Sequence, residues 1–157
     1  MIASGIKLGL HCSAVGVACG LLVWQLATGS GYHLFWLYAG LAAFITAAGL
    51  WMAVMGLLNR RREAAGRRPS MGLVGAIVGG LSGALAHPLC WFLQILAMYI
   101  CFRTTGGCVS SLGEPPMDPL TALWASWGFS FFSLIFFGWI TVPAGALIGF
   151  LHGRRLA

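Results

Sequence analysis

The segment GAIVGGLSGALAHPLCWFLQ, residues 75–94, holds the polar side chains that are best placed to do chemistry. His87, Cys90 and Gln94 follow one another at helical spacing, which places them on one face of a helix. Pro88 beside them frees a backbone carbonyl that such side chains can satisfy. Polar groups are costly to keep in apolar surroundings, so they either hydrogen-bond to another helix or serve a ligand. Both interpretations stay open, and His87, Cys90 and Gln94 are the candidate ligand-binding residues.

The sequence offers no set of side chains that is typical of a metal centre or a catalytic centre. The motifs CxxC and HExxH are absent. A haem or metal ion on His87 would need a second histidine at similar depth, but the others lie nearer the ends of the apolar runs: His11, His33 and His152. The acidic residues all fall between the apolar runs: Glu63, Glu114 and Asp118. We therefore predict no metal, no cofactor and no catalytic residue, and a protein that is not an enzyme.

The cysteines fall into two groups. Cys101 and Cys108 flank the short polar segment FRTTGG, where an oxidising compartment would allow a disulfide. The sequence leaves open whether these two candidates are bridged or free. Cys12, Cys19 and Cys90 lie in apolar runs, and we interpret them as small apolar fillers.

These residues are set in a chain with the composition of an integral membrane protein. Of its 157 residues, 59% are hydrophobic and 8% are charged, and the mean hydropathy is +0.89, whereas soluble domains carry about a quarter charged residues. Apolar runs long enough to cross about 30 Å of hydrocarbon occur at residues 8–27, 34–58, 71–102 and 121–151. Run 8–27 is longer than the apolar core of a usual secretory signal, so we keep it as a span. The fold class expected is an all-α bundle of four transmembrane helices, forming a single domain over residues 1–157.

The basic residues predict the orientation of this bundle. All but Arg103 fall on one side of a four-span arrangement: Lys7, Arg60, Arg61, Arg62, Arg67, Arg68, Arg154 and Arg155. Because short cytoplasmic loops collect lysine and arginine, we expect both termini and the basic loop 59–70 in the cytoplasm, loop 103–120 outside, and two antiparallel helical hairpins. The expected location is the bacterial inner membrane.

The formal net charge of +6 is therefore interpreted as a topology signal. The arginines adjoin the ends of spans and form no separate patch, so we expect no nucleic-acid partner. The loop from Arg60 to Arg68 is instead expected to attract anionic lipid.

Local patterns support the span boundaries. Ser70 is predicted to cap the third span, and Asp118 followed by Pro119 the fourth. Aromatic residues typical of a membrane interface cluster toward the expected outer side: Trp24, Tyr32, Trp36, Tyr38, Tyr99, Trp124 and Trp127.

Two glycine strips predict that the third and fourth spans pack closely. Residues four apart share a helix face, and the strips consist of Gly75, Gly79 and Gly83 in the third span and Gly145, Gly149 and Gly153 in the fourth. Both strips lie at the expected cytoplasmic ends of their spans. Small residues let helix backbones approach in lipid, so the strips should face each other. Gly16 and Gly20 give the first span a similar edge.

Known families of small four-span proteins help to separate the function classes. Membrane thiol oxidases carry a CxxC in their first outer loop, and small multidrug exporters carry a glutamate in their first span; this chain has neither. In topology alone, the layout is similar to that of immunity proteins against pore-forming bacteriocins. The expected function is thus a non-enzymatic accessory or assembly subunit, or an immunity-type protein, that binds another membrane protein or its own copy through helix packing. The alternative is a small channel, carrier or lipid- or quinone-binding protein that uses the polar residues of the third span.

Overall fold

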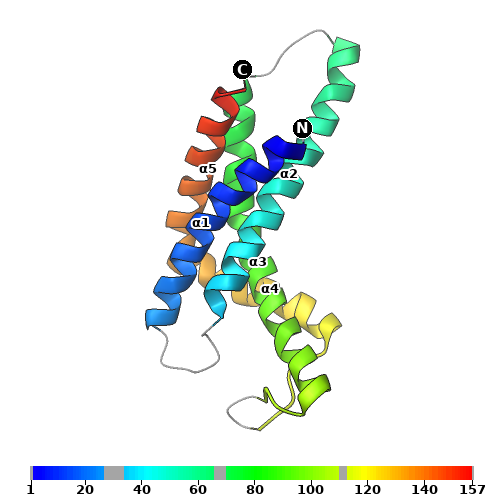
Figure 1. The fold of residues 1–157 in the computed structure, drawn as a ribbon, viewed down its shortest axis with the longest axis vertical. Coiled ribbons are helices and arrows are strands. Elements are labelled where there is room, and N and C mark those ends of the chain that lie inside the picture. Colours follow the sequence, from blue (N-terminus) through cyan, green and yellow to red (C-terminus); the bar gives the residue numbers. More distant parts are fainter. Residues whose placement is uncertain (1, 27–33, 66–69, 110–112, 157) are drawn as a thin grey trace.

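The computed structural model describes residues 2–26, 34–65, 70–109 and 113–156, and its regular elements there are all helical (Figure 1). In chain order they are α1 (Ile2–Leu26), α2 (Phe35–Ala65), α3 (Met71–Thr105), α4 (Pro119–Ser133), the π-helical segment η2 (Leu134–Gly138) and α5 (Trp139–Arg154). Four helical stretches are long and apolar enough to cross a membrane: Ile2–Leu26, Phe35–Arg60, Met71–Thr105 and Pro119–Arg154. The prediction of an all-α chain with four membrane-spanning candidates is confirmed.

The helices extend past the predicted apolar runs at most of their ends. α1 includes Lys7, and α3 includes Arg103. Backbone hydrogen bonding continues through polar residues, so a helix can extend beyond the segment that the hydrocarbon of a membrane would cover. The predicted connection 28–33, with Tyr32 and His33, lies outside the described residues, as do Arg67 and Arg68 of the basic loop.

The predicted helix caps have different outcomes. The Asp118 carboxylate accepts hydrogen bonds from the backbone N–H groups of Leu120 and Thr121, with Pro119 in the first turn, so this cap is confirmed. Ser70 does stand in extended conformation before α3, but its side chain makes no capping hydrogen bond. Only its backbone carbonyl takes part, accepting from the N–H of Val74. The predicted side-chain cap at Ser70 is therefore wrong.

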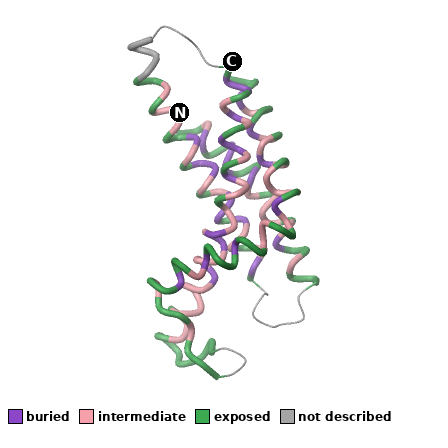
Figure 2. Tube along the Cα trace, turned by 180° about the vertical axis from the view of Figure 1, so that it is seen from behind, coloured by how far each residue is buried: buried purple, intermediate pink, exposed green. Residues whose placement is uncertain are grey.

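The helices associate as two close pairs, α1 with α2 and α3 with α5, and α2 and α3 join the pairs. Buried residues gather where the four long helices run together, and the arm formed by the end of α3 and by α4 is more exposed (Figure 2). The largest fully buried side chain is that of Trp51 on α2. Its ring meets the imidazole of His152 on α5 edge to face, with centroids 5.0 Å apart.

Glycines account for the closeness of the α3–α5 pair. A methyl group added at Gly75 would overlap the Gly149 carbonyl, and one added at Gly79 would overlap the Gly145 carbonyl. At the two ends of this α3–α5 contact, a glycine of one helix faces a residue of the other that is not glycine. Gly153 lies against the carbonyl of Met71, and Gly83 lies against the carbonyl of Thr141. Glycines also allow α1 and α2 to pack closely, since methyl groups at Gly16 and Gly20 would overlap the α2 backbone at Ala39 and Trp36.

The fourth span is sharply bent. Figure 1 shows α4 running at a steep angle to α5, with η2 at the corner between them. Pro143, one turn into α5, has no N–H to give to the preceding turn, and helices adjust upstream of such a residue. In α3, Pro88 lies near the middle, and the later half of the helix leans away from the earlier half (Figure 1). The two bends carry the α3–α4 arm away from α1 and α2.

Candidate functional site

A cavity of about 780 Å³ lies between the α1–α2 pair and the α3–α4–α5 unit. Such a volume is within the range of small-molecule sites in proteins. Most of its wall is apolar, supplied by aliphatic and aromatic side chains and by glycines. Its polar lining consists of a few side chains: Ser82, His87, Ser133, Thr141 and the thiols of Cys12, Cys19 and Cys90.

His87 is the centre of the polar part of the wall. Its Nδ1 lies 2.7 Å from the hydroxyl of Ser133, and its Nε2 lies 2.9 Å from the hydroxyl of Thr141. Each hydroxyl also lies near a carbonyl of its own helix: Ser133 Oγ is 3.3 Å from the oxygen of Ser130, and Thr141 Oγ1 is 3.1 Å from that of Phe137. We call His87, Ser133 and Thr141 the polar triad.

The bend of the fourth span is what assembles this triad. Ser133 ends α4 and Thr141 belongs to α5. In a straight α-helix, two residues eight positions apart are separated by about 12 Å along the axis, too far for one imidazole to contact both hydroxyls. The π-helical segment between them and the turn in the helix axis bring both hydroxyls to His87. π-helical segments inside α-helices are frequent at functional sites.

The three residues predicted as a ligand site are only partly brought together. His87 and Cys90 both line the cavity. Gln94 is buried farther along α3, with 7% of its surface exposed, and is not part of the cavity wall. Two members of the triad, Ser133 and Thr141, were not predicted as site residues. The sequence does contain a signal for them. Ser133 and Thr141 carry hydroxyl groups on the two sides of an apolar stretch, and Pro143 follows shortly after.

The cavity opens through the side of the helices. Phe132 and Phe136 belong to its lining, yet 62% and 67% of their surfaces are exposed. Across from them, α1 also lines the cavity but makes very few contacts with α4 or η2. The cavity is thus open on the side between α1 and η2, within helices that could cross a membrane.

A second polar contact ties the two helix pairs together near the N-terminal end of α1. Ser4 Oγ lies 2.8 Å from Nε2 of His152, the residue that meets Trp51 edge to face. Farther along α1, Nδ1 of His11 lies 2.6 Å from the backbone carbonyl oxygen of Lys7. Within the described residues no group of three or more His, Cys, Asp or Glu is close enough to hold a metal ion.

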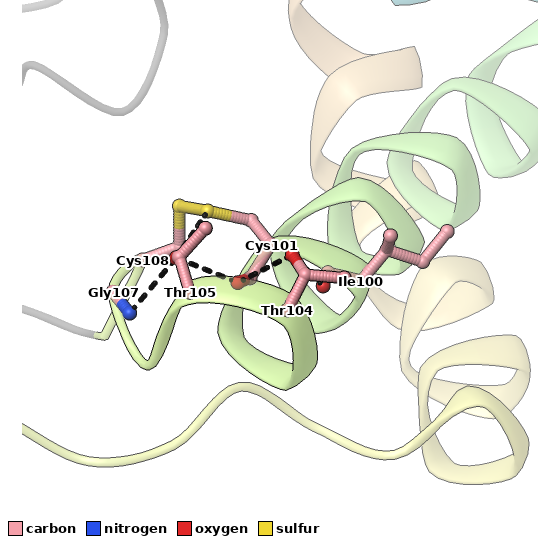
Figure 3. The surroundings of a disulfide bond; sticks show 6 residues. All are labelled: Ile100, Cys101, Thr104, Thr105, Gly107 and Cys108. Carbon is pink, nitrogen blue, oxygen red and sulfur yellow. Dashed lines mark hydrogen bonds between the residues drawn. A yellow bond between two sulfur atoms is a disulfide. The ribbon is translucent and has the colours of Figure 1, made fainter.

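Cys101 and Cys108 form a disulfide in the structure, with their Cα atoms 5.9 Å apart (Figure 3). The bridge closes the turn that ends α3. Gly106 adopts a left-handed conformation there (φ 71°), which an L side chain disfavours. Thr105 completes the turn, since its hydroxyl donates to the carbonyl of Cys101 and accepts from the N–H of Gly107 (Figure 3). This loop lies far from the cavity and does not contribute to it.

Comparison of the chain with protein-family models, with curated proteins and with solved structures finds no match.

Proposed function

We propose that the protein spans a membrane and binds a lipid-soluble small molecule in the cavity between its two helix pairs. The observation that carries the proposal is the cavity itself, an apolar chamber with one polar triad on its wall. Ligand sites are typically of this kind, mostly apolar with a few placed polar groups that orient the ligand.

The position of the opening supports a ligand that arrives from lipid. The lining residues Phe132 and Phe136 are largely exposed on helices whose outer surfaces are apolar, so a bilayer would surround the opening. A water-soluble substrate would have to leave water before entering there, at the cost of desolvating its polar groups. A hydrophobic molecule already dissolved in the bilayer has no such barrier.

The proposal is tested by filling the cavity from α1. Cys19 lines the cavity, whereas its neighbour Ala18 is exposed and is not part of the wall. We expect Cys19→Trp to abolish retention of the small molecule that co-purifies with the wild type in mild detergent, measured by native mass spectrometry and lipid extraction. Ala18→Trp, which adds the same side chain outside the cavity, should retain it. Equal retention by both variants would refute the proposal.

The orientation that we propose is the one expected from the basic residues, with both termini and loop 59–70 in the cytoplasm and two antiparallel hairpins in a bacterial inner membrane. Arg60 is exposed at the end of the second span candidate, where it could meet anionic lipid. A membrane-impermeant maleimide added from outside should label Gly113→Cys and miss Ala65→Cys, with the parent chain as background. Labelling of both positions would contradict this orientation.

A second candidate function, an accessory subunit or immunity-type protein, is supported by one surface. The fourth span exposes large aromatic side chains along its length: Trp124, Trp127, Phe131, Phe136 and Trp139. Aromatic residues are enriched where proteins bind one another, although a lipid interface also suits them. A photo-crosslinker at Trp127 should yield one discrete protein adduct if this surface docks a partner, and only lipid adducts if it faces the bilayer.

A further inference from the structure

The hydrogen atoms available to the polar triad do not match the contacts that it makes. Four close contacts are present: two from His87 to the hydroxyls of Ser133 and Thr141, and two from those hydroxyls to backbone carbonyls. Among the described residues no carboxylate lines the cavity, so no partner charge there favours an imidazolium, and an uncharged imidazole carries one ring hydrogen. With one hydrogen from each hydroxyl, three hydrogens serve four contacts.

The distances indicate which contact lacks a hydrogen. Hydrogen bonds between oxygens are normally 2.5–3.0 Å long. The two hydroxyl–carbonyl separations are 3.1 Å at Thr141 and 3.3 Å at Ser133, so the contact between Ser133 Oγ and the Ser130 carbonyl is the longest of the four. The tautomer that leaves this longest contact without a hydrogen is the one in which the Ser133 hydroxyl donates to Nδ1 of His87, at 2.7 Å. The ring donates from Nε2 to Thr141 Oγ1, and the Thr141 hydroxyl donates to the carbonyl of Phe137.

This chain of donors runs in one direction and begins at Ser133 Oγ. That oxygen has given its hydrogen to His87 and retains lone pairs that can accept. A ligand hydroxyl that donates to Ser133 Oγ would extend the chain by one bond, and successive hydrogen bonds of the same sense strengthen one another. A ligand carbonyl can only accept a hydrogen bond, and the polar triad already has one hydrogen fewer than its four contacts require.

We infer that the cavity selects an uncharged, lipid-soluble alcohol or phenol, with its hydroxyl donating to Ser133 and its apolar body lying along α1. This inference rests on the proposed function and names the class of its ligand. The wall supports an uncharged head group, because the part of the chain that the structure describes contributes no lysine, arginine, aspartate or glutamate to it. It supports an apolar body, because the α1 side of the chamber presents Val15, Gly16 and Val23.

A matched series of ligands tests the inference on the wild-type chain. The protein in phosphatidylcholine nanodiscs is given tritiated geranylgeraniol, and displacement is measured with the unlabelled alcohol, its aldehyde and its methyl ether. These three differ in the head group and share the apolar body. We expect the alcohol to bind about tenfold more tightly than the other two, the value of one net hydrogen bond.

The outcomes separate the inference from the proposed function. Equal affinity for the three compounds, or tighter binding of the aldehyde, would overturn the hydroxyl selection and leave the cavity as a general hydrophobic site. No binding of any of the three would overturn the proposed function as well.

Variants then locate the selection. His87→Phe combined with Ser133→Ala and Thr141→Val removes every side-chain acceptor of the triad, so the preference for the alcohol should disappear. The single change Ser133→Ala should keep the preference, because Nδ1 of His87 then accepts from the ligand directly. Cys19→Ala, elsewhere in the same wall, should also keep it. A preference that survives the triple variant would contradict the assignment to the triad.

Discussion

Replacing Gly79 by alanine tests whether backbone contact between α3 and α5 holds the bundle together. The added methyl group would overlap the carbonyl of Gly145 and lie 3.2 Å from Cα of Gly149, so the two helices would have to move apart. Overpacking of this kind costs about 1–3 kcal/mol. Alanine recovers up to about 1 kcal/mol of helix propensity relative to glycine. We therefore expect the free energy of unfolding to fall by about 1–2 kcal/mol, and Gly79→Leu to lose more.

The next residue provides the matched control. A methyl group at Gly80 would lie 3.6 Å from Cβ of Ala146 and 3.9 Å from Cγ1 of Val142, which are ordinary contacts. Gly80→Ala should therefore leave the stability unchanged or raise it by up to about 1 kcal/mol. The assay is unfolding in detergent micelles by titration with sodium dodecyl sulfate, followed by far-ultraviolet circular dichroism. If Gly79→Ala and Gly80→Ala unfold at the same point, the helices are not held by this contact.

Three further predictions concern the caps, the loop and the triad. Reduction of the Cys101–Cys108 bridge should lower the free energy of unfolding by about 2 kcal/mol, because the bridge restricts the unfolded chain by closing a short loop. The measurement is the shift in melting temperature on adding a reductant, and the variant with serine at both positions should show no such shift. Hydrogen bonds from the Thr121 side chain and the backbone at the start of α4 hold the pKa of Asp118 below its ordinary 3.8. The stability advantage of the wild type over Asp118→Asn should therefore be full above pH 4 and vanish as the pH falls through that lowered pKa, as followed by melting across pH. His87→Leu should lower the free energy of unfolding by about 1 kcal/mol, whereas His87→Gln, which keeps a donor and an acceptor, should melt like the wild type.

The four span candidates could be predicted because they depend on a local property, the length of an apolar run. The Asp118 cap was equally local, since the aspartate precedes Pro119 at a helix start. Helix ends were less predictable. α2 continues through Asn59 and Arg60, where apolarity has ended but backbone hydrogen bonding has not.

The cavity and the triad could not be predicted, because they depend on how two bends place distant residues. Pro88 identified one bend in the sequence, and Pro143 follows the π-helical segment of the fourth span, but neither proline indicates which side chains the bends bring together. Without the bend of the fourth span, Ser133 and Thr141 have no reason to approach one imidazole. His87 was therefore found as a polar residue in an apolar span, but its partners were not.

The glycine seam between α3 and α5 repeats every four residues on both helices, so it permits more than one register. In the structure Gly75 faces Gly149 and Gly79 faces Gly145. If α5 slid along α3 by four residues, about 6 Å, all six strip glycines would face one another: Gly75 with Gly153, Gly79 with Gly149 and Gly83 with Gly145. Glycine contacts alone would thus not favour the register that is observed.

The slide would, however, carry both hydroxyls of the fourth span past His87 and break its two hydrogen bonds. An unpaired imidazole in apolar surroundings is costly, and a single buried polar residue is known to select the register of paired helices in coiled coils. The same side chain that faces the cavity therefore favours the observed alignment of α3 and α5 over the alternative that the glycines leave open.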